Sequence, residues 1–176
     1  ILIVEADFVF EEVFDDVTVL KFLGVCRNSL DHIDLESATK HGVVVANVPG
    51  RNAQGVAELT MGLLISMARR IVPLNRYAHS GDWENPVEPY ISMRGVELHG
   101  KTLGLIGLGS IGRRVARLAN AFGMNVVAYD PYVGTPGRKK AAALLMTLDQ
   151  LVGKSDFVSV HTSETSETDG LLDRRH

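Results

Sequence analysis

Cysteine is nearly absent from this sequence, since Cys26 is the one thiol among 176 residues. A single cysteine excludes a disulfide within the chain and is typical of proteins from a reducing compartment. Long apolar runs are missing too, and none approaches the roughly 20 residues that span a bilayer. The first residues have neither the basic region nor the long apolar stretch of a signal peptide. We therefore expect a cytoplasmic protein with no membrane segment.

An excess of one charge is also lacking. Lys and Arg together number 18, Asp and Glu number 21, and the net charge is −3. Nucleic acids and acidic membrane surfaces attract proteins with a basic excess. We therefore expect neither a nucleic acid nor a membrane as partner.

Short apolar runs, by contrast, alternate with segments of helical period, which predicts an α/β fold with parallel strands. The sequence predicts buried strands over residues 1–4, 19–23 and 43–46. A helix is predicted over residues 34–41, because its first turn is acidic and Gly42 is a typical helix cap.

A long helix is expected from about Ala53 to Arg70. Apolar residues recur there at spacings of three and four, which places them on one face. They are Val56, Leu59, Leu63, Met67 and Ile71. Residues 80–100 are rich in Gly and Pro and read as a connection, and a second unit begins near Leu98.

The second unit opens with the pattern that carries the most chemistry. A strand over residues 101–106 runs directly into Gly107-Leu108-Gly109-Ser110-Ile111-Gly112. A helix follows to Phe122, and a second strand over residues 125–129 ends in Asp130. This strand–helix–strand unit has the length and the glycine spacing of a dinucleotide-binding fold.

Each of these residue types has a physical role. Gly107 permits a tight turn, Gly109 lets the backbone approach a pyrophosphate, and Gly112 lets the helix pack closely on the strand. The helix N-terminus directs unpaired amides at the phosphates. Asp130 can accept hydrogen bonds from both ribose hydroxyls and would repel a 2′-phosphate, which favours NAD over NADP. The alternatives are a tight turn without a ligand and an Asp130 that caps the following turn.

Several further segments, in this order along the chain, resemble the D-isomer-specific 2-hydroxyacid dehydrogenase family, which binds NAD. They are His32-Ile33-Asp34-Leu35-Glu36-Ser37-Ala38-Thr39-Lys40-His41-Gly42, Asn47-Val48-Pro49-Gly50, Asn52-Ala53 with Val56-Ala57-Glu58-Leu59-Thr60, Glu97 to Arg113, Phe122-Gly123-Met124, Tyr129-Asp130-Pro131, and Ser155-Asp156-Phe157-Val158 with His161-Thr162.

The resemblance implies two Rossmann-like or flavodoxin-like parallel-sheet domains, with the active site in the cleft between them. Residues 1–96 would be the N-terminal part of the substrate domain, and residues 97–176 the first part of the NAD-binding domain. Both domains would be incomplete in this chain, an N-terminal fragment. The family acts on a small 2-hydroxy or 2-oxo acid. It usually forms homodimers through the helix after Ala53 and the connection around Trp83.

The resemblance places a substrate loop at residues 25–31, where relatives grip the substrate carboxylate with backbone amides. Cys26, Arg27 and Asn28 lie in it, but Arg27 and Ser29 replace two glycines of the family pattern. Arg27 is either a surface arginine or a ligand for an anionic group. Asn28 matches a position that touches the cofactor.

Further cofactor contacts follow from the same resemblance. Ser110 and Ile111 match the pair beside the pyrophosphate and adenosine, Val56 matches a position near the nicotinamide, and Thr162 matches a contact at the carboxyl edge of the sheet. Ser163 stands where the family has proline in this last loop.

The family's catalytic Arg, Glu and His have no match here and are expected beyond His176. Among the six histidines, we expect His32, His41, His79 and His99 to be solvated or capping residues. His161 matches a non-catalytic position, and we expect no metal site. The leading hypothesis is an NAD-dependent oxidoreductase that is truncated and inactive in this form. A non-catalytic NAD-sensing protein and an inactive remnant are the alternatives.

Overall fold

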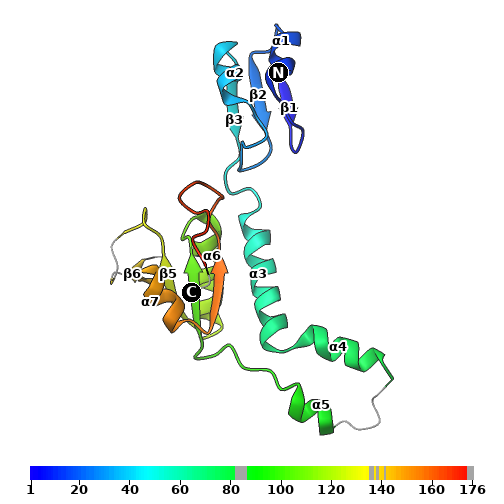
Figure 1. The fold of residues 1–176 in the computed structure, drawn as a ribbon, viewed down its shortest axis with the longest axis vertical. Coiled ribbons are helices and arrows are strands. Elements are labelled where there is room, and N and C mark those ends of the chain that lie inside the picture. The colour runs from blue at the N-terminus through cyan, green and yellow to red at the C-terminus, as the bar shows by residue number, and fades with distance from the viewer. Residues whose placement is uncertain (82–86, 135–136, 138, 141, 174–176) are drawn as a thin grey trace. The chain divides into compact units, whose positions relative to one another are not determined.

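The computed structural model describes residues 1–81, 87–134, 137, 139–140 and 142–173. It has two compact units, Ile1–Asn52 and Ala53–His176 (Figure 1). The expected division after residue 96 differs from this one. Helix α3 (Ala53–Ala68) packs on helix α6 (Ser110–Ala121) and therefore belongs to the second unit. Trp83 lies outside the described residues.

Unit 1 is a small parallel α/β layer with the strand order β1-β2-β3. Its elements are β1 (Leu2–Val4), α1 (Glu11–Asp16), β2 (Phe22–Val25), α2 (Leu35–Lys40) and β3 (Val44–Asn47). Strand β2 begins three residues later than expected, because Leu23 and Val25 are the residues that fill the core whereas Val19 is 81% exposed.

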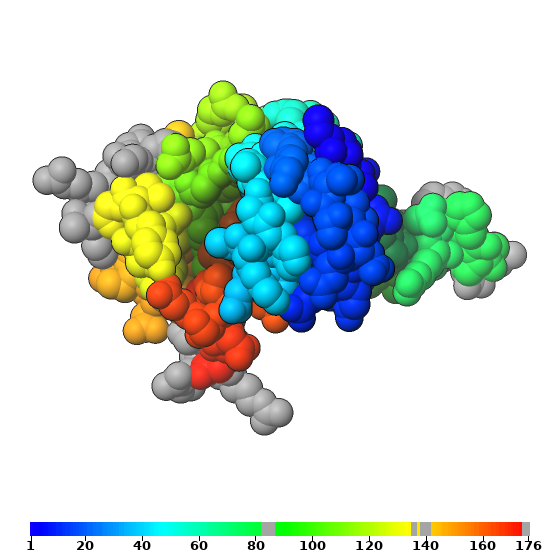
Figure 2. Space-filling view, turned by 90° about the horizontal axis from the view of Figure 1, so that it is seen from above, coloured from blue at the N-terminus to red at the C-terminus, as the bar shows by residue number. Residues whose placement is uncertain are grey.

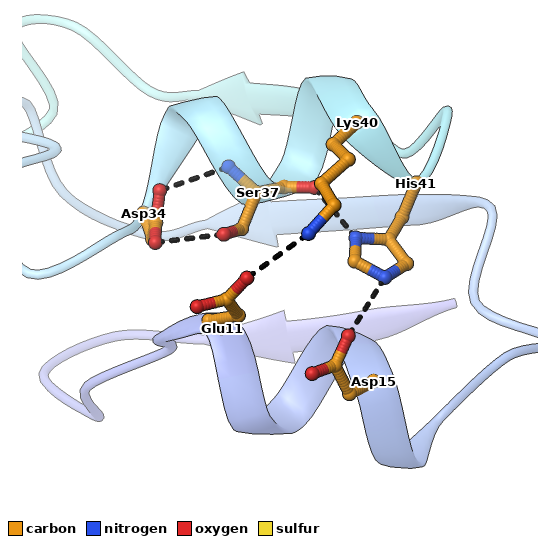
Figure 3. Close-up of polar contacts among 6 residues, drawn as sticks. All are labelled: Glu11, Asp15, Asp34, Ser37, Lys40 and His41. Carbon is orange, nitrogen blue, oxygen red and sulfur yellow. Dashed lines mark hydrogen bonds and ion pairs between the residues drawn. The ribbon is translucent and has the colours of Figure 1, made fainter.

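Helices α1 and α2 lie side by side on one face of this sheet (Figure 3). Lys40 pairs with Glu11 at 3.1 Å, and His41 Nε2 lies 3.0 Å from Asp15 Oδ1. Asp34 begins α2 as its N-cap and accepts from the Ser37 amide, which satisfies one of the free donors of the first turn. In the space-filling view, the blue and cyan segments of this unit form one body (Figure 2).

Unit 2 holds a sheet with the order β6-β7-β5-β4-β8, in which all neighbours are parallel except β6 and β7. Its strands are β4 (Thr102–Ile106), β5 (Asn125–Tyr129), β6 (Lys139–Lys140), β7 (Ala143–Leu145) and β8 (Phe157–Val160). The order β7-β5-β4-β8 is the 3-2-1-4 half of a Rossmann fold. The direction of winding reverses at β4, so the crevice between the carboxyl ends of β4 and its neighbours is the expected ligand edge.

The alternation of side chains along β4 separates the two layers that cover the sheet. Leu103 and Leu105 belong to the core cluster shared with α3 and α6. Ile106 belongs to the cluster that contains Leu151 of α7 (Leu148–Lys154). Helices α6 and α7 therefore cover opposite faces (Figure 1), as the period of two along a strand requires.

Helix α3 is apolar on two faces. The side that packs in the core carries Ala53, Ala57, Met61, Leu64 and Ala68. The apolar stripe expected from the sequence is instead exposed, at 61% for Leu59, 56% for Leu63 and 70% for Met67. Alanines on the buried side permit a close approach to α6, whereas the bulky stripe does not contact the core.

Two shorter helices follow, α4 (Ile71–His79) and α5 (Val87–Ser92). Arg70 is the N-cap of α4, and its left-handed backbone conformation separates α4 from the end of α3. In the part of the chain that the structure describes, no helix is both long and apolar enough to cross a membrane.

Candidate functional site

The glycine loop between β4 and α6 has the backbone geometry that the sequence pattern requires. Gly107 has φ of +92°, and a Cβ there would lie 2.7 Å from the His161 carbonyl oxygen. A Cβ on Gly112 would lie 2.2 Å from the Gly107 carbonyl oxygen. Side chains at both positions would collide with backbone. These two glycines allow β4, β8 and α6 to meet closely.

Gly109 differs from the other two glycines because the space beside it is open. It is the N-cap of α6, it makes no side-chain cap, and a Cβ there would meet nothing within 4 Å. The first amides of a helix have no partner within the helix, and the helix dipole makes this end positive. The open side of Gly109 can therefore receive an anionic group at the start of α6.

Asp130 lies at the carboxyl end of β5 and is held by two amides. Its Oδ2 accepts from the Leu108 amide at 2.8 Å, and its Oδ1 accepts from the Tyr132 amide at 3.0 Å. The hydrogen bond from the Tyr132 amide shows that Asp130 also caps the following turn, which was the alternative role predicted for it. Each carboxylate oxygen has a second acceptor position, so the fixed carboxylate can still accept two hydroxyl donors.

A cavity of about 320 Å³ opens at the same edge of the sheet. It brings Gly107, Asp130 and Thr162 together, three residues that the sequence assigns to the cofactor. The remaining lining residues are Tyr129, Pro131, Tyr132, Glu167, Thr168 and Leu171.

Tyr132 and Glu167 were not expected in this site. The Tyr132 hydroxyl donates to the Glu167 carboxylate across the cavity. The hydrogen bond to Glu167, and then the negative charge of this carboxylate, raise the pKa of the Tyr132 phenol. No local pattern in the sequence indicates this pair, because the two residues are 35 positions apart and meet only when β5 and β8 join one sheet.

The other predicted cofactor residues take different places. Ser110 is exposed in the first turn of α6 and lines a second hollow with Arg113, Arg114 and Arg117. The half-buried Ile111 side chain packs against the main core. Val56 is half-buried on α3 and does not line the 320 Å³ cavity.

The predicted substrate loop follows β2 in unit 1. Cys26 is half-buried, while Arg27 and Asn28 are exposed at the carboxyl edge of the sheet. The backbone amide of Cys26 donates to the Val4 carbonyl at 2.8 Å. The loop therefore starts from the edge at which β1 and β2 end.

Two histidines behave differently from simple surface residues. The expectation that His32 is solvated or capping is wrong, since it is 2% exposed, with Nδ1 3.2 Å from Asp31 Oδ1. The imidazole ring of His32 packs edge to face against the phenyl ring of Phe8. His161 contacts the Ser159 hydroxyl at 3.0 Å, and partial burial lowers its pKa.

The comparison with protein families shows which family this chain belongs to. Residues 61–176 match the model of the D-isomer specific 2-hydroxyacid dehydrogenase NAD binding domain. The chain belongs to this family. The matched region begins on α3 and lies within the second compact unit.

Relatives of known name extend the similarity to the first unit. YoaD of Bacillus subtilis, named as a 2-hydroxyacid dehydrogenase, is 41% identical over 176 residues, which cover 99% of this chain and 50% of YoaD. D-3-phosphoglycerate dehydrogenase of the same organism is 38% identical and is covered over 32% of its length, with 99% of this chain aligned. The chain therefore spans half or less of these relatives.

Solved structures show the same fold. The TT0316 protein from Thermus thermophilus has a TM-score of 0.86 at 38% identity, covering 99% of this chain and 54% of that one. An NAD-dependent formate dehydrogenase from Staphylococcus aureus, solved with NAD, has a TM-score of 0.80 at 28% identity, with coverage of 98% and 51%. An acyclic imino acid reductase solved with NADPH and D-Arg has a TM-score of 0.78 at 31% identity, with coverage of 94% and 52%. The cofactor of the family is thus a nicotinamide dinucleotide, with NAD in its family model.

Proposed function

We propose that the whole protein transfers a hydride reversibly between NAD(H) and C2 of a D-2-hydroxy or 2-oxo acid. Unit 2 of this chain would hold the cofactor, and the loop after β2 would hold the substrate carboxylate. The nicotinamide supplies the hydride chemistry, while the protein orients the two reactants. The single observation that carries the proposal is the glycine loop at the start of α6 with Asp130 fixed beside it.

The residues present fit a dinucleotide. The open side of Gly109 and the first turn of α6, with Ser110, would bind the pyrophosphate through backbone amides. Asp130 would accept the ribose hydroxyls, and Thr162, which lines the same cavity, would contact the cofactor. Val56, Ile111 and Asn28 remain predicted contacts by family resemblance.

NAD is preferred to NADP in this proposal. Asp130 lines the cavity together with Glu167, and two carboxylates repel a 2′-phosphate. We expect Asp130→Ser to weaken NADH binding at least about tenfold, because two charge-assisted hydrogen bonds are lost. The same change should narrow the ratio between the dissociation constants of NADPH and NADH, both measured by nicotinamide fluorescence. An unchanged ratio would contradict the role of Asp130.

The test of the activity uses the whole protein from its natural gene. Absorbance at the NADH band is followed with a panel of 2-oxo acids, and the configuration of the hydroxyl product is determined. Turnover that gives the D-isomer is the expected result. Binding of NADH without turnover of any 2-oxo acid would support a non-catalytic NAD-sensing protein instead. Failure to bind NADH would leave an inactive remnant.

We infer further that the protein forms a homodimer through α3. The stripe of Leu59, Leu63 and Met67 is exposed and bulky, and contiguous apolar surface of this kind is typical of interfaces. The free thiol of Cys26 is compatible with a cytoplasmic location, which remains a prediction.

A further inference from the structure

The backbone of the loop after β2 is held by three hydrogen bonds from the last residue of β3 and the segment that follows it. Arg51 Nη1 donates to the Cys26 carbonyl at 2.7 Å, and the Val48 amide donates to the Arg27 carbonyl at 3.2 Å. Asn47 Nδ2 donates to the Asn28 carbonyl at 2.7 Å. Three successive carbonyls of this loop therefore point toward the segment that carries Asn47 and Arg51.

The direction of these carbonyls also sets the direction of the amides. The structure has no cis peptide bond among its described residues, and in a planar trans peptide the C=O and the next N–H point in opposite directions. The amides of Arg27, Asn28 and Ser29 therefore point away from the end of β3 and the segment after it. Within the described part of the chain, none of these three amides donates a hydrogen bond to the protein. Successive unpaired amides with a common direction form an anion-binding concavity.

Arg51 connects a third loop to the same point. Its Nη1 also lies 2.7 Å from Glu5 Oε1, and Glu5 directly follows β1. One guanidinium group therefore joins the segments that follow β1, β2 and β3 at the carboxyl edge of the sheet. The planar fork of arginine suits such a double contact, whereas lysine offers a single point charge.

We propose that Arg51 and Asn47 are positioning residues for substrate, an inference that rests on the proposed function. By holding the carbonyls of residues 26 and 28, they keep the loop amides directed at a carboxylate of the 2-oxo acid. Arg27 and Ser29 stand where the family resemblance places two glycines, and two side-chain donors, Asn47 and Arg51, hold the loop backbone here. Neither Arg51 nor Asn47 needs to touch the substrate.

The experiment compares variants of the whole protein at saturating NADH. Arg51→Ala and Asn47→Ala remove one anchor each, and Asn47→Asp keeps the side-chain shape while losing the donor. Arg51→Lys is the conservative variant. The matched control is Lys40→Ala, which removes an exposed ion pair with Glu11 from the same unit but before β3 begins (Figure 3). The readouts are kcat, KM for the 2-oxo acid, and the Kd of oxamate, an unreactive carboxylate analogue.

The loss of one carbonyl anchor is expected to raise KM and the oxamate Kd about tenfold, with kcat changed less than about threefold. Arg51→Lys should recover part of this loss, and Lys40→Ala should leave all three values at those of the wild type. A fall in kcat alone, or equal effects in Lys40→Ala and Arg51→Ala, would overturn the proposal.

The same measurements distinguish a failure of the proposed function from a failure of the inference about Arg51 and Asn47. If the wild type shows no turnover but binds oxamate, the oxamate Kd of the variants still decides whether Arg51 and Asn47 position the loop. If the wild type does not bind oxamate in the presence of NADH, the loop is no carboxylate site and the inference is wrong. NADH binding itself, measured by fluorescence, reports on unit 2 alone.

Discussion

Gly109 and Gly112 stand in one loop, yet a methyl group at each position would meet different surroundings. At Gly112 the added Cβ would lie 2.2 Å from a backbone oxygen, whereas at Gly109 nothing lies within 4 Å. We expect Gly112→Ala to lower the free energy of unfolding by about 2 kcal/mol, the usual cost of overpacking. Gly109→Ala should change that free energy by less than about 1 kcal/mol but weaken NADH binding at least about tenfold.

Urea unfolding and NADH titration of the same two variants separate these effects, and each variant serves as the control for the other. Equal stability of Gly112→Ala and the wild type would contradict the close packing of α6 on the loop. Unchanged NADH affinity in Gly109→Ala would contradict the placement of the pyrophosphate.

His161 makes stability depend on pH in a defined direction. Burial lowers its pKa below the ordinary value of 6.5, so the native state favours the neutral imidazole. Its contribution to stability is therefore present above pH 6.5 and is lost as the pH falls through the lowered native pKa. In His161→Gln we expect a smaller loss of unfolding free energy between pH 7.5 and pH 5, measured in urea. A loss equal to that of the wild type would show that other groups cause the acid sensitivity.

At the scale of elements, α3 offers two adjacent leucines in contrasting surroundings. Leu64 is 7% exposed in the core cluster, and Leu63 is 56% exposed. Leu64→Ala should cost about 3 kcal/mol, because it removes buried apolar contacts and leaves a cavity. Leu63→Ala should cost less than about 0.5 kcal/mol in dilute protein. Thermal and urea unfolding would measure both, and similar losses would mean that the burial of α3 is assigned to the wrong face.

The elements of unit 2 follow closely from local patterns. The span of β4, the glycine loop and α6 agrees with the sequence to within one or two residues, because the glycine positions and the apolar periods coincide there. Strand β2 was placed less well. The apolar residues Val17, Val19 and Leu20 precede it, and only its pairing with β1 and β3 determines which apolar residues form the strand.

At the scale of the whole molecule, the exposed stripe of α3 predicts the oligomeric state. Leu63→Glu should halve the mass measured by light scattering at several concentrations, because a charge in an apolar interface is costly. Gln54→Glu introduces the same charge at another exposed position of α3 and should leave the mass unchanged. A monomeric wild type, or a dimer that survives Leu63→Glu, would refute the proposed dimer through α3.

The sequence by itself determined the α/β class, the strand–loop–helix that opens unit 2, and the family. These features depend on residues close together in the chain, such as Gly107, Gly109 and Gly112, whose backbone requirements are local. Family resemblance also indicated the loop of Cys26, Arg27 and Asn28 before any contact was known.

Only the tertiary structure decided which side of α3 is buried, that His32 lies in the core of unit 1, and that Tyr132 meets Glu167 in the cavity. It alone showed that Arg51 and Asn47 hold the loop after β2. Each of these facts depends on residues brought together by the order of strands in a sheet. The local period of apolar residues in the sequence predicts that one face of a helix or strand is apolar. The free energy of packing between distant segments decides what that face contacts.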